Sequence, residues 1–229
     1  MTKKFVVFDL DGTLLDTVRG MQKALNKTLL DKGYLKHDFT YEEVKSFIGG
    51  GAKRMYCLAT KEKEVNEEVF ALYLKYYKLY QGESEFYPHV LSTISKLKEA
   101  GYTLIIYSNK PHEVLKDLSI KKNLNQYFDF IQGQDFAYPP KPDVTLLNKI
   151  LSDFDLDPKD GYYVGDSRYD VLTGRNASLK TIILTYGYED ANIFEKKEYK
   201  PDYIIDSFDK LEEILWLEAK NMSLVSSDI

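Results

Sequence analysis

Four groups of polar residues in this chain could carry out chemistry together. They are DLDGT at residues 9–13, SNK at 108–110, a lysine at 141, and GDS at 165–167 followed by an aspartate at 170. Carboxylates serve as nucleophiles, acids, bases and ligands of hard metal ions, while hydroxyl and ammonium groups bind phosphate oxygens. Taken singly, DLDGT could be a turn, and SNK or GDS could cap a helix. Their occurrence together favours a joint function.

The elements that must position these groups are visible as alternating patterns. Short β-branched and aromatic runs predict strands at 3–9, 102–107, 128–132, 161–164, 179–185 and 202–205. Helical patterns lie at about 89–100, 112–123, 143–153, 168–177 and 207–220, and we expect a frayed tail over 219–229. The alternation implies βαβ crossovers, so the predicted fold is α/β, a doubly wound, Rossmann-like parallel sheet with helices on both faces.

The first group of polar residues stands directly after the first predicted strand. Side chains two residues apart at a strand end point to the same side, so Asp9 and Asp11 should face one site while Leu10 turns into the core. Gly12 allows the backbone to turn sharply after them. Ligands of open α/β sheets bind beyond the carboxyl ends of the strands, and the other groups also stand at strand ends or before helices. We therefore expect all four groups to converge.

Residues 17–82 have a different character from the rest of the chain. They show no convincing strand pattern and no proline up to about residue 80, and their apolar residues recur at helical spacing. We predict an all-helical insert over 17–82 that divides the α/β core into residues 1–16 and 83–229, with 81–84 as the return linker. Tyrosines 73, 76, 77 and 80 form a stripe on its last helix, which we interpret as packing, with substrate stacking as the alternative.

Composition and charge narrow the range of partners. Hydrophobic residues make up 44% of the chain and charged residues 29%, as in ordinary globular proteins. A net charge of −5 gives no basic footprint for a nucleic-acid polymer, and the apolar runs are far shorter than the roughly 20 residues of a membrane helix. A lone cysteine, Cys57, and two aspartates close to the N-terminus predict a reducing, cytoplasmic location. A monomer and a homodimer both remain open.

The four groups resemble the four motifs of the haloacid dehalogenase superfamily. DLDGTLLDT, YSNKP, the lysine of PPKPD and VGDSRYD carry the resemblance, which covers nearly the whole chain. The segments EFYPHVLSTISKLKEAGY and YYVGDSRYDVLTGRNASLKTIILTYGYED resemble the phosphoglycolate phosphatase-like branch, in which a helical cap is inserted after the first motif. The resemblance implies a Mg²⁺-dependent phosphatase acting on a small phosphomonoester, with 2-phosphoglycolate as the first expectation. Pyrophosphate, nucleoside monophosphates and sugar phosphates remain alternatives.

The resemblance also implies a role for each residue. Asp9 would be the nucleophile that forms an aspartyl-phosphate, and Asp11 the general acid and then the general base. Asp9, Asp166 and the main-chain oxygen of Asp11 would hold Mg²⁺. Asp170 would orient metal-bound water or Lys141, with direct ligation as the less favoured alternative. The phosphoryl oxygens would be bound by Ser108, Asn109 and Lys141.

Two further segments bear on the substrate. The family often has Gly, Pro and Gly where this chain has His89, Val144 and Ser178, and none of these positions touches a reacting group. In the insert, three glycines at 49–51 lead into a helix start with two cations, so Lys53 or Arg54 could bind a second anionic group such as the carboxylate of phosphoglycolate. The alternative is a flexible turn with solvated charges.

Other functions remain to be weighed against a phosphatase. A β-phosphoglucomutase-like isomerase shares Asp9 and Asp11, whereas haloacid dehalogenases and phosphonoacetaldehyde hydrolases lack the carboxylate found here as Asp11. A non-enzymatic phosphorylation receiver also has acidic residues, a hydroxyl and a lysine at strand ends. Receivers are shorter and lack the insert, and a catalytically dead binding module is disfavoured because every expected group is present.

Overall fold

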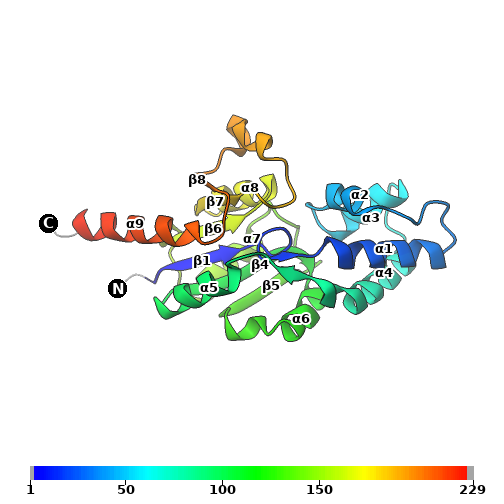
Figure 1. Cartoon of the computed structure of the whole chain (residues 1–229), viewed down its shortest axis with the longest axis horizontal. Coiled ribbons are helices and arrows are strands. Elements are labelled where there is room, and N and C mark those ends of the chain that lie inside the picture. Colours follow the sequence, from blue (N-terminus) through cyan, green and yellow to red (C-terminus); the bar gives the residue numbers. More distant parts are fainter. Residues whose placement is uncertain (1–2, 226–229) are drawn as a thin grey trace.

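A six-stranded parallel sheet forms the centre of the molecule (Figure 1). The computed structural model describes the backbone of residues 3–225 and the side chains of residues 3–217. The strands are β1 Phe5–Phe8, β4 Thr103–Pro111, β5 Phe130–Gln134, β6 Gly161–Gly165, β7 Lys180–Leu184 and β8 Tyr203–Ile205. They run in the order β5-β4-β1-β6-β7-β8. The chain thus starts in the middle of the sheet and winds outward on both sides, which confirms the predicted doubly wound α/β fold.

The central strand β1 shows why the sheet is covered on both faces. Its four residues, FVVF, are all fully buried, as expected for a parallel strand between two helical layers. Phe5 and Val7 point into one hydrophobic cluster, whereas Val6 and Phe8 point into another on the opposite face. This alternation fixes the register of β1 against β4 and β6, since a shift by one residue would exchange the two faces.

Five helices follow the strands of the sheet. They are α5 Val90–Glu99, α6 His112–Lys121, α7 Thr145–Asp153, α8 Arg168–Asn176 and α9 Lys210–Val225. Short 3₁₀ turns lie at Leu124–Gln126, Pro158–Asp160, Ala191–Glu195 and Lys197–Tyr199. The 3₁₀ turns were not predicted, whereas the strands and the five helices agree with the sequence prediction within a few residues, except at the end of the chain. There, helix α9 continues to Val225, so the expected fraying from residue 219 is wrong up to that point, and residues 226–229 lie outside the described residues.

Four helices occupy the segment between β1 and α5, and Figure 1 shows them together at one end of the molecule. They are α1 Val18–Asp31, α2 Tyr41–Phe47, α3 Ala52–Thr60 and α4 Glu67–Tyr80, followed by a 3₁₀ turn at Gln81–Glu83. They enclose a hydrophobic cluster of their own, which Val114 of α6 joins from the α/β part. A capping box between Thr40 and Glu43 starts α2, and the Asn66 side chain caps α4. The boundaries of a separate cap at 17–82 remain a prediction.

A two-stranded antiparallel ladder joins the chain where it leaves for these helices and where it returns. β2 Leu15–Asp16 pairs with β3 Glu85–Phe86, with Leu15 opposite Phe86. This ladder was not predicted from the sequence, because two residues are too short a run to show strand periodicity. Within residues 3–225, none of the helices combines the length and the apolar character of a membrane-spanning segment.

Candidate active site

The polar residues singled out in the sequence gather at the carboxyl ends of β1, β4 and β6. Asp9 follows β1 directly, Ser108 lies near the end of β4, and Asp166 follows β6. The loop after β1 is held to β6 by the Asp9 N–H, which donates to the Val164 carbonyl oxygen at 2.9 Å. Because neighbouring parallel strands end at the same edge of a sheet, three segments far apart in sequence meet at this point.

Gly12 allows the loop after β1 to pass close beside Asp166. Its φ of 89° lies in the left-handed region, and a Cβ at this position would lie 2.3 Å from Asp166 Oδ2. Only glycine satisfies both the conformation and the close approach. The next residue, Thr13, donates its hydroxyl proton to Asp166 Oδ1 at 2.8 Å. The Gly-Thr pair therefore brings the end of β1 against the end of β6.

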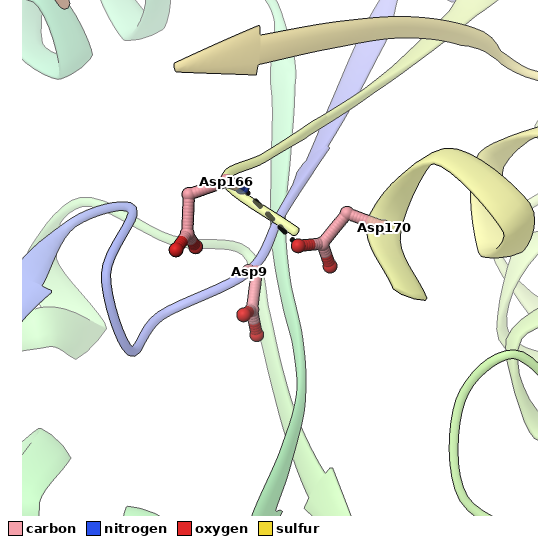
Figure 2. Close-up of side chains that lie close together, drawn as sticks. All are labelled: Asp9, Asp166 and Asp170. Carbon is pink, nitrogen blue, oxygen red and sulfur yellow. Dashed lines mark hydrogen bonds between the residues drawn. The ribbon is translucent and has the colours of Figure 1, made fainter. Parts of the chain in front are cut away.

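Three buried carboxylates lie close together at this edge (Figure 2). Asp9, Asp166 and Asp170 each contribute one oxygen to a group in which all three atoms lie within 4.8 Å of one another. Burial raises the pKa of Asp9 to about 6, even though Lys141 acts to lower it. Burial, together with the charges of Asp170 and Asp9, also raises the pKa of Asp166 well above its ordinary value. The protein thus leaves part of this negative charge uncompensated.

Asp170 has both of its oxygens engaged by the protein. Oδ1 accepts a hydrogen bond from Lys141 Nζ at 2.7 Å. Oδ2 accepts from the Asp166 N–H at 3.2 Å, which Figure 2 marks with a dashed line, and from the Ser167 N–H and hydroxyl at 2.9 and 2.6 Å. The carboxylate of Asp170 therefore orders the loop after β6 and places the lysine.

The donor set at this edge fits a divalent cation such as Mg²⁺. Carboxylate oxygens are the hard ligands that Mg²⁺ prefers. Each oxygen of Asp166 accepts one hydrogen bond, from the Thr13 hydroxyl and from the Tyr188 N–H, both at 2.8 Å, so lone pairs remain on both. Within residues 3–217 no Lys or Arg forms an ion pair with Asp166. Asp9 and Asp166 could hold a cation that compensates the charge they share.

Lys141 stands between two carboxylates. Its Nζ lies 2.9 Å from Asp9 Oδ1, in addition to its bond with Asp170. Burial by itself would lower the pKa of Lys141, but the charges of Asp170 and Asp9 raise it well above its ordinary value. Asn109 fastens the backbone of this lysine, since its Oδ1 accepts from the Lys141 N–H at 2.8 Å. The side chain of Asn109 thus contacts the lysine loop, and both Asn109 and the buried Ser108 line the cavity described below.

Asp11 is held by two residues to which the sequence analysis gave no role. Its Oδ1 accepts from the Thr17 hydroxyl at 2.7 Å and from Lys110 Nζ at 3.0 Å. The side chain of Lys110 is fully buried. The sequence contained a signal for the position of Lys110. Ser108 and Lys110 are two residues apart, so on an extended strand their side chains share one side.

A cavity of about 260 Å³ separates the sheet edge from the helices α1–α4. Asp9, Asp11 and Asp166 line it from the sheet, and the glycine loop 49–51 and Arg54 line it from the helices. Of the two cations considered for a second anion, only Arg54 lines the cavity, and it is exposed. Lys53 instead donates to Glu67 at 2.8 Å, and its ammonium lies over the rings of Phe70 and Phe136.

Comparisons with known proteins agree with this arrangement. A family model described as haloacid dehalogenase-like hydrolase matches residues 6–184. The chain is 34% identical over 218 residues to the phosphoglycolate phosphatase of Agrobacterium fabrum, covering 92% of this chain and 91% of the relative. It is 33% identical over 189 residues to that of Aquifex aeolicus, covering 82% and 88% respectively.

A solved structure shows the same overall fold. It is described as a predicted phosphoglycolate phosphatase from Haemophilus somnus 129pt and superimposes with a TM-score of 0.79. The sequences are 29% identical, and the match covers 93% of this chain and 98% of that one. Sequence and structure are therefore both similar to those of haloacid dehalogenase-like hydrolases that are named phosphoglycolate phosphatase.

Proposed function

The chain belongs to the haloacid dehalogenase-like hydrolase family, and we propose that it is a Mg²⁺-dependent phosphatase of small phosphomonoesters, with 2-phosphoglycolate as its first substrate. The observation that carries the proposal is the meeting of Asp9, Asp11, Ser108 and Lys141 at one cavity beside Asp166. These groups supply a nucleophile, an acid, phosphate donors and a metal ligand at one point. The choice of 2-phosphoglycolate as the substrate rests on the relatives that are named phosphoglycolate phosphatase.

The two aspartates of the first group would divide the reaction into two displacements. Asp9 attacks the phosphorus atom, and the bond between phosphorus and the ester oxygen breaks while Asp11 gives that oxygen its proton. The aspartyl-phosphate on Asp9 is then hydrolysed by a water molecule whose proton Asp11 takes. Lys110 and Thr17 hold the Asp11 carboxylate in one orientation for both transfers.

The remaining groups bind and orient the phosphoryl group. Ser108 and the ammonium of Lys141 donate to its oxygens, and Asn109 acts through the backbone of that lysine. Asp9, Asp166 and the main-chain oxygen of Asp11 are the proposed Mg²⁺ ligands. When bound, the ion screens the repulsion between Asp9 and the anionic phosphate. The four bonds that engage Asp170 support a role in positioning the lysine and the loop after β6 instead of direct ligation.

The helices α1–α4 would act as a cap, over residues 17–82. They supply one wall of the cavity, and its volume of about 260 Å³ lies below the roughly 300–1,000 Å³ of sites for drug-sized ligands. A small ester such as phosphoglycolate suits this volume. Closure of the cap would exclude bulk water from Asp9 while it attacks the substrate.

Phosphate release with Mg²⁺ tests the proposal. The panel contains 2-phosphoglycolate, pyrophosphate, a nucleoside monophosphate, a hexose phosphate and β-glucose 1-phosphate, with Asp9→Asn as the control. We expect the highest kcat/KM for phosphoglycolate and no turnover in the control. Conversion of β-glucose 1-phosphate to glucose 6-phosphate without free phosphate would establish the mutase alternative. Turnover by Asp9→Asn would refute the role of Asp9 as the nucleophile.

A further inference from the structure

The helical wall of the cavity carries two tyrosines that face the end of β4. Tyr73 and Tyr77 are one helical turn apart on α4, so they lie on the same face, and both are 1% exposed. Their rings are 5.6 Å apart between centroids. Both residues line the cavity together with Lys110. The sequence pattern had favoured packing for these tyrosines, and burial agrees with that, but their hydroxyl groups have a different environment from their rings.

The hydroxyl of Tyr73 has no hydrogen-bond partner among the described residues, although it is buried. A buried hydroxyl without a partner is unfavourable, and such groups in folded proteins are uncommon. Burial raises the pKa of Tyr73 well above its ordinary value, so the group keeps its proton and remains a donor. A ligand in the cavity that accepts a hydrogen bond would satisfy it.

Lys110 offers a second donor at the same place. An ammonium group has three N–H donors. One is directed to Asp11 Oδ1 at 3.0 Å and another to the Tyr77 hydroxyl, while Tyr77 also places its ring 4.1 Å from the ammonium. Among the described residues the third N–H has no partner. Tyr77 thus fixes the position of Lys110, and Lys110 can still bind an anion.

We propose that Lys110 and Tyr73 bind the carboxylate of the substrate, with Tyr77 as the residue that positions Lys110. This inference rests on the proposed phosphatase function. In phosphoglycolate a single methylene separates the carboxylate from the ester oxygen. Because Asp11 protonates that oxygen, the carboxylate must lie close to Asp11, and Lys110 is the cation in contact with Asp11. Arg54 is exposed, and Lys53 is paired with Glu67.

The test compares 2-phosphoglycolate with ethyl phosphate, which is similar in size but lacks the carboxylate. In Tyr73→Phe we expect the ratio of kcat/KM for phosphoglycolate to that for ethyl phosphate to fall at least about tenfold, mainly through the KM for phosphoglycolate, since a hydrogen bond to a charged group is lost. The matched control is Tyr76→Phe, also on α4, which does not line the cavity and whose hydroxyl donates to Asp31 at 2.5 Å. It should leave the ratio within about twofold of wild type.

A binding measurement gives a second, independent readout. In the Asp9→Asn background, calorimetric titration with phosphoglycolate should show about tenfold weaker binding when Tyr73→Phe is added. Lys110→Met should weaken it further, with partial rescue in Lys110→Arg. Tyr73→Phe removes a single oxygen that has no partner, so its thermal unfolding should show a Tm no lower than that of wild type.

The outcomes separate this inference from the proposed function. A wild-type protein that releases no phosphate from either ester overturns the proposed function and the inference with it. A wild-type protein that hydrolyses both esters, with a ratio that Tyr73→Phe leaves unchanged, overturns the inference alone. The inference also fails if Arg54→Gln lowers the ratio tenfold and Tyr73→Phe does not, because the carboxylate is then bound at the glycine loop.

Discussion

The two walls of the cavity differ in how their polar groups are satisfied. On the sheet side, Asp170 accepts four hydrogen bonds and Lys141 is fastened through its backbone and its ammonium group. On the helical side, Tyr73 is buried with a hydroxyl that has no partner among the described residues. Lys141 and Asp170 of the sheet wall are held in place before the substrate arrives. The Tyr73 hydroxyl of the helical wall gains its hydrogen-bond partner only when the substrate binds. Chemistry is assigned to the sheet wall, and selectivity to Tyr73 of the helical wall together with Lys110 at the end of β4.

The largest effect is expected on the sheet side, from Asp9→Asn. Loss of the nucleophile should lower kcat by at least about 1,000-fold. The same variant should unfold at an equal or higher Tm without metal, because burial raises the pKa of Asp9 to about 6 and the ionised carboxylate is therefore unfavourable in the fold. Phosphate release and calorimetry measure the two effects. A variant with a lower Tm would show that Lys141 compensates the Asp9 charge fully, and would contradict the unfavourable burial that the raised pKa indicates.

The next effect concerns the lysine of the sheet wall. Lys141→Met leaves Asp9 and Asp170 buried without their cation, and should lower the free energy of unfolding by about 3–5 kcal/mol. The control is Lys149→Met, which removes an exposed i,i+4 pair with Asp153 and should change stability by no more than about 0.5 kcal/mol. Urea unfolding at neutral pH gives both values. Equal losses in the two variants would contradict the assignment of Lys141 to an ordered wall.

Mg²⁺ should stabilise the protein through the same wall. At a concentration ten times its Kd, an ion that binds only the folded state adds about 1.4 kcal/mol, or roughly 3–6 °C in Tm for a chain of this size. Asp166→Asn should abolish the shift. An Asp166→Asn protein that still gains the full shift would place the metal elsewhere.

The pH dependence of the metal-free protein follows from the same carboxylates. The pKa of Asp9 is about 6 in the fold and 3.8 in a model peptide, so the folded state binds more protons between these values. Relative to Asp9→Asn, the stability of the wild type should therefore fall as the pH rises from about 4 to about 6, and Mg²⁺ should reduce this fall. Thermal unfolding of both proteins with and without Mg²⁺ over this range measures it, and a wild type whose stability rises relative to Asp9→Asn would refute the raised pKa.

The smallest effect lies far from both walls, at a turn of the α/β part. Ser178 follows the end of α8 with a φ of 59°, where the family often has glycine. Ser178→Gly should raise the free energy of unfolding by about 0.5 kcal/mol, since relief of the left-handed conformation outweighs the added freedom of the unfolded chain. Ser92→Gly, inside helix α5, should lower it by a similar amount. Activity should be unchanged in both, and a loss in Ser178→Gly would contradict the prediction.

The sequence predicts positions that depend on local patterns, such as strand ends, but not contacts that depend on how distant elements pack. Asp9, Asp11 and Asp166 could be placed at one edge because each stands at the end of a recognisable strand, and parallel strands end together. Lys110 could have been placed beside Ser108 by the same alternation. The environment of Tyr73 could not be predicted, because it depends on how α4 packs against the end of β4. A helical stripe of tyrosines alone does not distinguish a ring in a core from a hydroxyl in a cavity.

The short ladder of β2 and β3 has a further consequence for how such a chain could have arisen. The pairing of Leu15 with Phe86 and of Asp16 with Glu85 holds the two ends of the helical segment side by side. A segment whose ends are adjacent can be exchanged for another, or shortened to a loop, without altering the register of the large sheet. The ladder is therefore a site at which the helical segment can be replaced. Such a replacement changes selectivity and leaves the catalytic edge of the sheet unchanged.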